Sequence, residues 1–273
     1  MTVLQDHFKL SNGMQMPKLG FGTWQITDPQ QAYDATSNAL ASSYRHIDTA
    51  RVYENEESVG RAIRDSGIPR NELFVATKLP AEFKDHDEAL GSFETTMEAI
   101  GLDYVDLYMI HAPWPWNAIG QDCAAGNIAV WKALEAIHQS GRARAIGVSN
   151  FNVTDLKVIL DNCAIKPMVN QIRFFIGHSQ PDVVNFCKDE GIQVTGYSPL
   201  ATGKLLANPT IAEVAQHYGK SVAQICIRYV LQKGIAPLPK STCAERIQNN
   251  ADVDFQITNE DIAQLDALND KDI

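Results

Sequence analysis

The sequence has few cysteines and none of the paired spacings that build disulfide frameworks or zinc sites. Its 273 residues include five cysteines, at positions 123, 163, 187, 226 and 243, and no Cys-x-x-Cys pair. An odd number of scattered cysteines is typical of reduced thiols in a cytoplasm, whereas zinc sites and secreted scaffolds use closely spaced pairs. We therefore expect a cytoplasmic protein with free thiols and no bound metal.

Long apolar runs and an export signal are also missing. No stretch approaches the length of a membrane span. Residues 1–10 have neither a basic segment followed by an apolar core nor a small-residue cleavage site. The formal net charge of -10 argues against nucleic acid and anionic membrane surfaces as partners, although a local basic pocket could still bind phosphate.

The glycine-rich fingerprint of a Rossmann dinucleotide fold is absent as well. Residues 19–24, LGFGTW, contain Gly-x-Gly without a third glycine at the required offset. A dinucleotide site would then have to use another part of the chain. No Gly/Ser linker, composition break or low-complexity tract divides the sequence, so we expect one domain over residues 1–273.

What the sequence does contain is an eightfold alternation of strand-like and helix-like segments. The expected strands are residues 17–24, 44–49, 73–79, 105–111, 143–150, 167–174, 192–200 and 235–241. The expected helices are residues 29–41, 55–65, 87–100, 129–141, 154–163, 181–191, 209–234, 244–252 and 259–270. Pro181 falls in the first turn of one helix, and Thr154 is a candidate N-cap of another.

Eight such units in about 250 residues predict a (β/α)8 barrel of the TIM type, with a doubly wound sheet as the alternative. Asn12-Gly13 between alternating apolar flanks predicts an N-terminal β-hairpin over residues 8–16 that closes one end of the barrel. Residues 259–270 would add an extra C-terminal helix. In such barrels the active site lies at the face that carries the C-terminal ends of the strands.

Residues 44–60, YRHIDTARVYENEESVG, place a carboxylate on a buried strand. The period of two puts Tyr44, His46 and Asp48 on one face of that strand. Asp48 needs a cationic partner from elsewhere in the chain, because an unpaired buried charge is costly or loses its ionisation. Tyr53 follows in the loop before the next helix.

Polar, titratable or aromatic residues stand at or just past nearly every expected strand end. They are Trp24, Asp48, Tyr53, Lys78, His111, Ser149, Asn150, Gln171, Tyr197, Ser198, Lys240 and Ser241. Each has an ordinary structural explanation when taken singly, but together they fit one chemistry. Tyr53 can protonate a carbonyl oxygen if the cation of Lys78, with Asp48 as its counter-ion, makes the phenolic proton more available. His111 can orient the carbonyl or share its proton.

The chain resembles the aldo-keto reductases essentially from end to end. YRHIDTA-x2-Y-x-NE-x2-VG is similar to the first signature of that family, and residues 238–250, LPKSTCAERIQNN, are similar to the third. The resemblance implies NADPH-dependent reduction of aldehydes and ketones to alcohols. It also implies that Tyr53 is the general acid, that Asp48 and Lys78 tune it, and that His111 orients the substrate. The cofactor would supply the hydride.

The resemblance further implies how NADP(H) is held. Lys240, Ser241 and Arg246 match residues that bind the 2′-phosphate, which agrees with the preference of phosphate for lysine and the planar arginine fork. Other matches hold the nicotinamide amide, stack on its ring or cover the pyrophosphate. The whole set of implied cofactor residues is Gly22, Thr23, Ser149, Asn150, Gln171, Tyr197, Ser198, Leu200, Lys204, Lys240, Ser241, Arg246 and Asn250.

Some positions depart from the family pattern. Ser43 stands where the first signature usually has glycine, and Asn249 stands where the family often has glutamate. The motifs KLP and HAPWPW lack two aromatic walls that many members have. We expect Trp114 or Trp116 to replace them beside Trp24 in the substrate pocket.

The chain ends at Ile273, where many relatives continue with a loop over the pocket. We therefore expect a more open pocket for small polar aldehydes and ketones. Keto-sugars of the kind handled by similar short bacterial enzymes, the 2,5-diketo-gluconate reductases, fit the same expectation. A monomer is the family-like state.

Three alternatives use the same residues. A non-catalytic NADP-binding sensor or partner subunit would have no need for the complete set of catalytic residues. A Schiff-base aldolase could use Lys78 as its nucleophile, but it has no use for a dinucleotide phosphate site. A metal hydrolase could use His46, Asp48 and His111, although His46 lies one layer deeper and is expected in the core.

Overall fold

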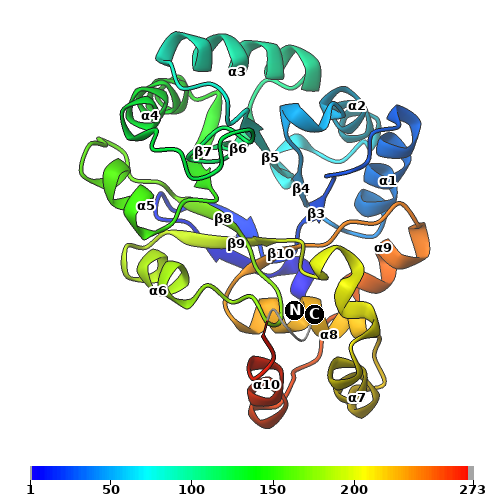
Figure 1. The fold of residues 1–273 in the computed structure, drawn as a ribbon. Coiled ribbons are helices and arrows are strands. Elements are labelled where there is room, and N and C mark those ends of the chain that lie inside the picture. The colour runs from blue at the N-terminus through cyan, green and yellow to red at the C-terminus, as the bar shows by residue number, and fades with distance from the viewer. Residues whose placement is uncertain (1, 270–273) are drawn as a thin grey trace.

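The computed structural model describes residues 2–269, and eight parallel strands form its centre. Each strand pairs with the next in chain order (Figure 1). The strands are β3 Phe21–Gly22, β4 His46–Asp48, β5 Phe74–Leu79, β6 Val105–Ile110, β7 Ala143–Ser149, β8 Val169–Arg173, β9 Gln193–Tyr197 and β10 Ala236–Leu238. They lie within the eight predicted segments but are shorter at most ends.

The ring is closed by hydrogen bonds between its first and last strands. The N–H of Gly20 donates to the carbonyl of Pro237 at 3.1 Å, and the N–H of Gly22 donates to the carbonyl of Pro239 at 3.1 Å. A Cβ atom on Gly22 would lie 3.2 Å from the backbone carbonyl oxygen of Leu238, and one on Gly20 would lie 2.5 Å from the Leu238 side chain, so glycine at both positions allows this close approach. The two glycines of LGFGTW therefore allow β3 to lie close to β10. The closed barrel confirms the predicted fold class over the doubly wound alternative.

Helices surround the barrel as an outer layer (Figure 1). They are α1 Pro29–Ala41, α2 Glu56–Asp65, α3 His86–Ile100, α4 Ala124–Gln139, α5 Val153–Leu160, α6 Pro181–Asp189, α7 Pro209–Tyr218, α8 Val222–Gln232, α9 Ala244–Ala251 and α10 Asn259–Asp266. The extra C-terminal helix is α10, which lies at the periphery. The buried apolar side chains form one continuous cluster between the strands and these helices.

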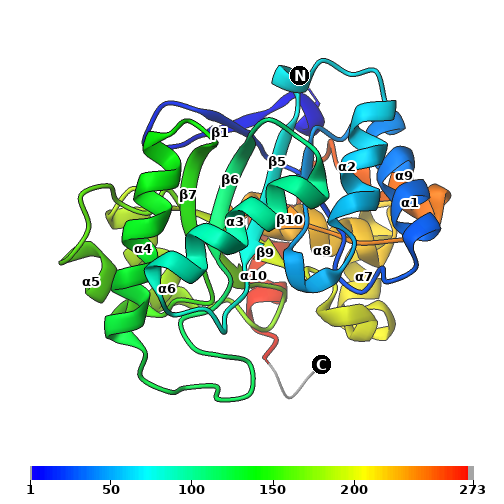
Figure 2. The ribbon, with the colours of Figure 1, turned by 90° about the horizontal axis from the view of Figure 1, so that it is seen from above.

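The N-terminal hairpin is present and covers one end of the barrel. Its strands, β1 His7–Lys9 and β2 Gln15–Pro17, pair antiparallel around the predicted Asn12-Gly13 turn. The Asn12 amide donates to the carbonyl of Arg144 at the start of β7, 3.0 Å away. The hairpin thus closes the end where the strands begin, and the long connection from β6 to α4 lies at the opposite end (Figure 2).

Several helix boundaries differ from the sequence predictions. The helix expected over residues 129–141 is α4, which begins five residues earlier, at Ala124, and ends at Gln139. Thr154 is not the N-cap of α5, because Asn152 caps it two residues earlier through a reciprocal capping box with Asp155. The region 209–234 is not one helix. It divides into α7 and α8, since Gly219 adopts a left-handed φ of 60° and Ser221 caps the second helix.

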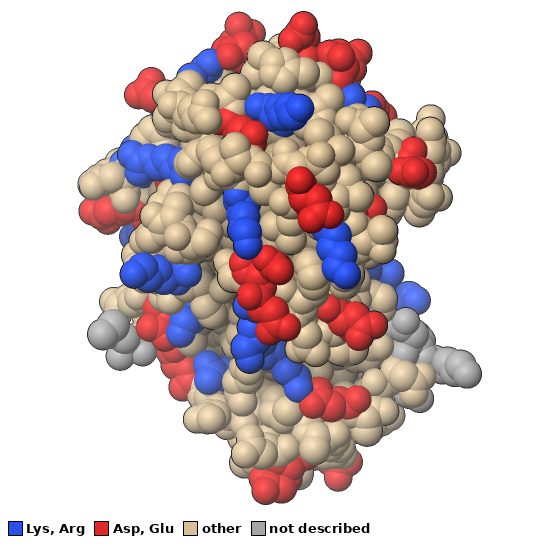
Figure 3. Space-filling view, turned by 90° about the vertical axis from the view of Figure 1, so that its left-hand side faces the viewer, with Lys and Arg blue, Asp and Glu red and all other residues tan. Residues whose placement is uncertain are grey.

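The surface carries charges of both signs. On the face shown in Figure 3, Lys and Arg side chains are interspersed with Asp and Glu side chains. Across residues 2–269, none of the helices has the length and apolar character needed to span a bilayer. The expectation about the chain end at Ile273 concerns residues 270–273, which lie outside the described residues.

Candidate active site

A cavity of about 1100 Å³ opens at the end of the barrel where the strands end. Most of the residues singled out from the sequence line it. These are Gly22, Trp24, Asp48, Tyr53, His111, Trp116, Ser149, Asn150, Gln171, Tyr197, Ser198, Leu200, Lys240, Ser241, Arg246 and Asn250. Strands far apart in the chain deliver these side chains to one place because parallel strands end on the same face of the barrel.

A buried ion pair lies at the base of this cavity. The Lys78 Nζ atom donates to Asp48 Oδ1 at 2.6 Å and to the carbonyl of Thr49 at 2.8 Å. Gln171 donates through Nε2 to the other carboxylate oxygen of Asp48 at 2.8 Å. Lys78 is wholly buried, so burial lowers its pKa, while the charge of Asp48 acts in the opposite direction. Lys78 is the cationic partner that a buried Asp48 requires.

Tyr53 and His111 stand above the pair, in the cavity wall. The Tyr53 hydroxyl lies 3.5 Å from His111 Nε2, and Lys78 Nζ lies 5.2 Å from the centre of the Tyr53 ring. Burial, reinforced by the charge of Asp48, raises the pKa of Tyr53 well above its usual range. Burial and the charge of Lys78 hold the pKa of His111 well below its usual range. At neutral pH the site therefore presents a protonated phenol beside a neutral imidazole.

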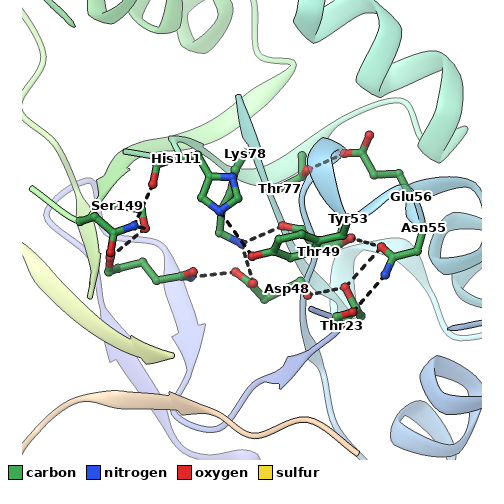
Figure 4. A network of polar contacts seen from close by, with 12 residues as sticks. Thr23, Asp48, Thr49, Tyr53, Asn55, Glu56, Thr77, Lys78, His111 and Ser149 are labelled. Atoms are coloured by element: carbon green, nitrogen blue, oxygen red, sulfur yellow. Dashed lines mark hydrogen bonds and ion pairs between the residues drawn. The ribbon is translucent and has the colours of Figure 1, made fainter. Parts of the chain in front are cut away.

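A buried asparagine fixes the loop that carries Tyr53. Asn55 accepts a hydrogen bond from Thr49 Oγ1 at 2.7 Å, and its amide donates to the carbonyl of Thr23 at 3.0 Å (Figure 4). The amide also donates to the carbonyl of Ile26 at 3.0 Å. These bonds join the loops that follow β3 and β4. Thr23 is buried and donates to the carbonyl of Asp48 at 3.0 Å. The position of Tyr53 is thus set by backbone and side-chain hydrogen bonds of its neighbours.

A second network links the ends of β6 to β9. Ser149 Oγ donates to the carbonyl of Gln171 at 2.9 Å. The amide of Asn150 donates to the carbonyl of His111 at 2.9 Å, and its Oδ1 accepts from the Tyr197 hydroxyl at 2.8 Å. Asn150 adopts a left-handed φ of 62°, which turns its side chain back across the strand ends. The network places amide and hydroxyl groups beside the Asp48–Gln171 contact.

The far side of the cavity is cationic. Lys240 and Ser241, in the connection between β10 and α9, line it together with Arg246 in the first turn of α9. Among residues 2–269, no carboxylate pairs with Lys240 or Arg246, so both cations are available to an anionic ligand. The backbone N–H of Cys243 donates to Ser241 Oγ at 3.1 Å, which orders the turn before α9.

Four of the residues singled out from the sequence do not line the cavity. Thr23 and Lys78 are buried behind Asp48 and support it from below. Lys204 lies in the turn Ala201–Ala207, outside the wall. Trp114 packs on Trp116 with ring centres 5.1 Å apart, and it is Trp116 that reaches the cavity and contacts the His111 ring edge-on.

The sequence reasoning did not identify Arg173, which also lines the cavity. The signal was present, because the period of two in β8 places Arg173 on the same face as Gln171. His46 lies in the core against Phe74, with ring centres 4.9 Å apart. In the part of the chain that the structure describes, no group of His, Cys, Asp or Glu is arranged to hold a metal ion.

Comparisons with known proteins agree on one family. The model of the "Aldo/keto reductase family" matches residues 18–270. The glyoxal reductase of Bacillus subtilis (strain 168) is 42% identical over 269 residues, covering 98% of this chain and 94% of that protein.

Solved structures agree with that match. An aldo-keto reductase from a Medee basin deep-sea metagenome library superposes with a TM-score of 0.90 at 40% identity, over 96% of this chain and 94% of that one. A Bombyx mori aldo-keto reductase solved in complex with NADP superposes with a TM-score of 0.88 at 35% identity, over 98% of this chain and 93% of that one.

Proposed function

Because the chain belongs to the aldo/keto reductase family, we propose that it reduces small polar aldehydes and ketones to alcohols with NADPH, using Tyr53 as the general acid. One observation carries the proposal. A protonated Tyr53 phenol lies in the wall of a large cavity, 3.5 Å from a neutral His111 and directly above the Asp48–Lys78 ion pair.

The cavity has the features that a phosphorylated dinucleotide needs. Lys240 and Arg246 are cations without a carboxylate partner among residues 2–269, and Ser241 lies between them in sequence. Lysine and the planar arginine fork are the groups that bind phosphate best, so they suit a 2′-phosphate. The cavity of about 1100 Å³ exceeds what a small carbonyl compound alone would require. The bound nicotinamide supplies the hydride.

Ser149, Asn150 and Gln171 offer amide and hydroxyl groups to the nicotinamide amide at the opposite side of the cavity. Tyr197 stands next to them and provides an aromatic face. These residues select the position of the cofactor in the cavity. The distribution of cations on one side and neutral polar groups on the other defines a direction for the dinucleotide.

Tyr53 delivers the proton that the developing alkoxide requires. A phenol whose pKa is raised keeps its proton in the resting site, so it acts as an acid and not as a base. The Lys78 cation near the Tyr53 ring stabilises the negative charge that the phenolate acquires as the proton leaves. His111, neutral and fixed through its backbone carbonyl by Asn150, can donate a hydrogen bond to the same carbonyl oxygen.

The walls of the cavity favour small substrates with polar groups. Trp24 and Trp116 are 44% and 39% exposed at its mouth, so the entrance is partly aromatic and remains open. One relative is named a glyoxal reductase, and its name supports small aldehydes as substrates. Keto-sugars remain part of the proposal.

The test compares Tyr53→Phe with the wild-type protein. NADPH binding is measured by intrinsic fluorescence, and turnover with a panel of small carbonyl compounds is measured by nicotinamide absorbance. Loss of a positioned acid should lower kcat by about 10²- to 10⁴-fold, while NADPH affinity stays nearly constant because the ring packing is kept. Tyr33→Phe, at a half-buried tyrosine of α1 whose hydroxyl donates to Asp65, is the matched control and should leave kcat unchanged.

Two results would contradict the proposal. An unchanged kcat in Tyr53→Phe would exclude Tyr53 as the acid. NADPH binding by the wild-type protein without oxidation by any carbonyl compound would favour the alternative of a non-catalytic NADP-binding sensor or partner subunit.

A further inference from the structure

Arg173 is a cation at the cavity that neither the ion pair nor the phosphate-binding side uses. It is the last residue of β8, and its Cα is the register partner of Tyr197 in β9. Its side chain shares a face with Gln171 and lies one layer closer to the mouth of the barrel. Gln171 contacts Asp48, so Arg173 belongs to the reactive side of the cavity.

The structure holds the Arg173 side chain without neutralising it. Its guanidinium lies 5.0 Å from the centre of the Phe175 ring, and its backbone carbonyl accepts a hydrogen bond from the Gln180 amide. Among residues 2–269, no carboxylate forms an ion pair with Arg173, whereas Arg70 and Arg142 each have one. The chain has a net charge of -10, so carboxylates are plentiful, yet this arginine at the cavity has no ion-pair partner within the described residues and can bind an anionic ligand.

The other charged groups of the cavity wall have partners or a proposed ligand of their own. Asp48 is the only carboxylate in the wall within the described residues, and Lys78 and Gln171 occupy both of its oxygens. Lys240 follows β10, which pairs with β9 on the side away from β8. Arg173 is therefore separated from the 2′-phosphate side by Tyr197 and its strand. An anion at Arg173 would lie on the β8 side of the cavity, with Gln171, and not at its cationic end.

Building on the proposed function, we propose that Arg173 binds a carboxylate of the substrate and gives the enzyme a preference for carbonyl compounds that carry an acid group. The class includes short aldehyde acids and keto acids, and among keto-sugars the oxidised acids over the neutral sugars. The planar guanidinium can form two parallel hydrogen bonds to a carboxylate, which adds orientation as well as affinity. The contact with the Phe175 ring already limits the motion of Arg173, so less conformational entropy is lost when the carboxylate binds.

The test uses a charged and a neutral aldehyde of equal chain length, 4-oxobutanoate and butanal, with NADPH. Arg173→Gln should lower kcat/KM for 4-oxobutanoate by about 10- to 100-fold, mainly through KM, and leave butanal within about twofold. Arg173→Glu should lower kcat/KM for 4-oxobutanoate further, because the two carboxylates repel each other. Arg61→Gln, which removes the same charge from a helix surface, is the matched control and should change neither substrate.

Cofactor phosphates are the other source of an anion for Arg173, and the Kd of NADPH distinguishes the two. A carboxylate-specific loss with an unchanged Kd supports the proposal. If kcat/KM falls equally for both aldehydes and NADPH binds more weakly, Arg173 binds the cofactor and the proposal is overturned. An unchanged kcat/KM for both aldehydes would also overturn the proposal.

A binding measurement without turnover separates this proposal from the proposed function. Succinate is titrated against the enzyme with NADP⁺ by fluorescence, with succinamide as the neutral control. Succinate should bind the wild-type protein about 10-fold more tightly than Arg173→Gln, and succinamide should not distinguish them. Equal succinate affinities would refute the role of Arg173 whether or not the enzyme reduces carbonyl compounds. Thermal unfolding of each variant verifies that it is folded.

Discussion

Replacement of Lys78 by methionine tests the most buried charge of the site. The change keeps the unbranched apolar stem and removes only the ammonium, which donates at 2.6 Å to Asp48 and at 2.8 Å to the carbonyl of Thr49. Asp48, itself only 3% exposed, then keeps the hydrogen bond from Gln171 as its remaining support. The variant therefore contains a buried carboxylate without a cation.

Breaking a buried pair in this way costs about 3–5 kcal/mol, because the remaining charge stays desolvated. Domains have a total stability of about 5–15 kcal/mol, so the loss is a large fraction of the whole.

The assay is urea unfolding followed by tryptophan fluorescence at about pH 7.5, where Lys78→Met should be less stable than wild type by about 3–5 kcal/mol. Asp48→Asn combined with Lys78→Met is the control, because it removes the unpaired charge and should recover most of the lost stability at about pH 7.5. Both variants should reduce carbonyl compounds poorly, since neither can stabilise the Tyr53 phenolate. If the double variant is no more stable than Lys78→Met, the cost does not come from Asp48 and the reasoning is refuted.

Three further changes test other parts of the structure. Lys240→Ala with Arg246→Ala should weaken NADPH binding by about 100-fold or more and NADH binding little, since only NADPH has the 2′-phosphate; equal losses in a fluorescence titration would refute this assignment. Burial raises the pKa of Glu56 from 4.5 to about 7, so the folded state keeps a proton that the unfolded state has released, and stability falls as pH rises through that window. In urea unfolding, the free energy of unfolding of the wild-type protein should fall by on the order of 3 kcal/mol between pH 4.5 and about 7. Glu56→Gln, which still accepts a hydrogen bond from Thr77, should remove this fall. A wild-type stability that rises over the same pH window would contradict the prediction. Ser43 has a left-handed φ of 69°, so Ser43→Gly should stabilise the fold by up to about 1 kcal/mol with unchanged kcat/KM, whereas a gain of equal size in Ser43→Ala would exclude backbone strain as the cause.

Local patterns predicted much of the architecture. The period of two and the helical spacing identified eight strands and their helices, and Asn12-Gly13 identified the hairpin, because these signals arise from neighbours along the chain. Boundaries were less accurate. Thr154 has a residue type that suits a cap, but Asn152 also has the partner Asp155 needed for a reciprocal capping box.

The sequence by itself determined that Asp48 lies on a buried strand and needs a cation, since burial without a partner is too costly. Only the tertiary structure decided which groups meet it. Lys78 is 30 residues away and Gln171 is 123 residues away, and both reach the carboxylate because the barrel closes on itself. The closure likewise brings Arg173 into the cavity and leaves Lys204 outside it. Periodicity determines the face of a strand, but contacts between distant strands depend on the closed ring that all eight form together.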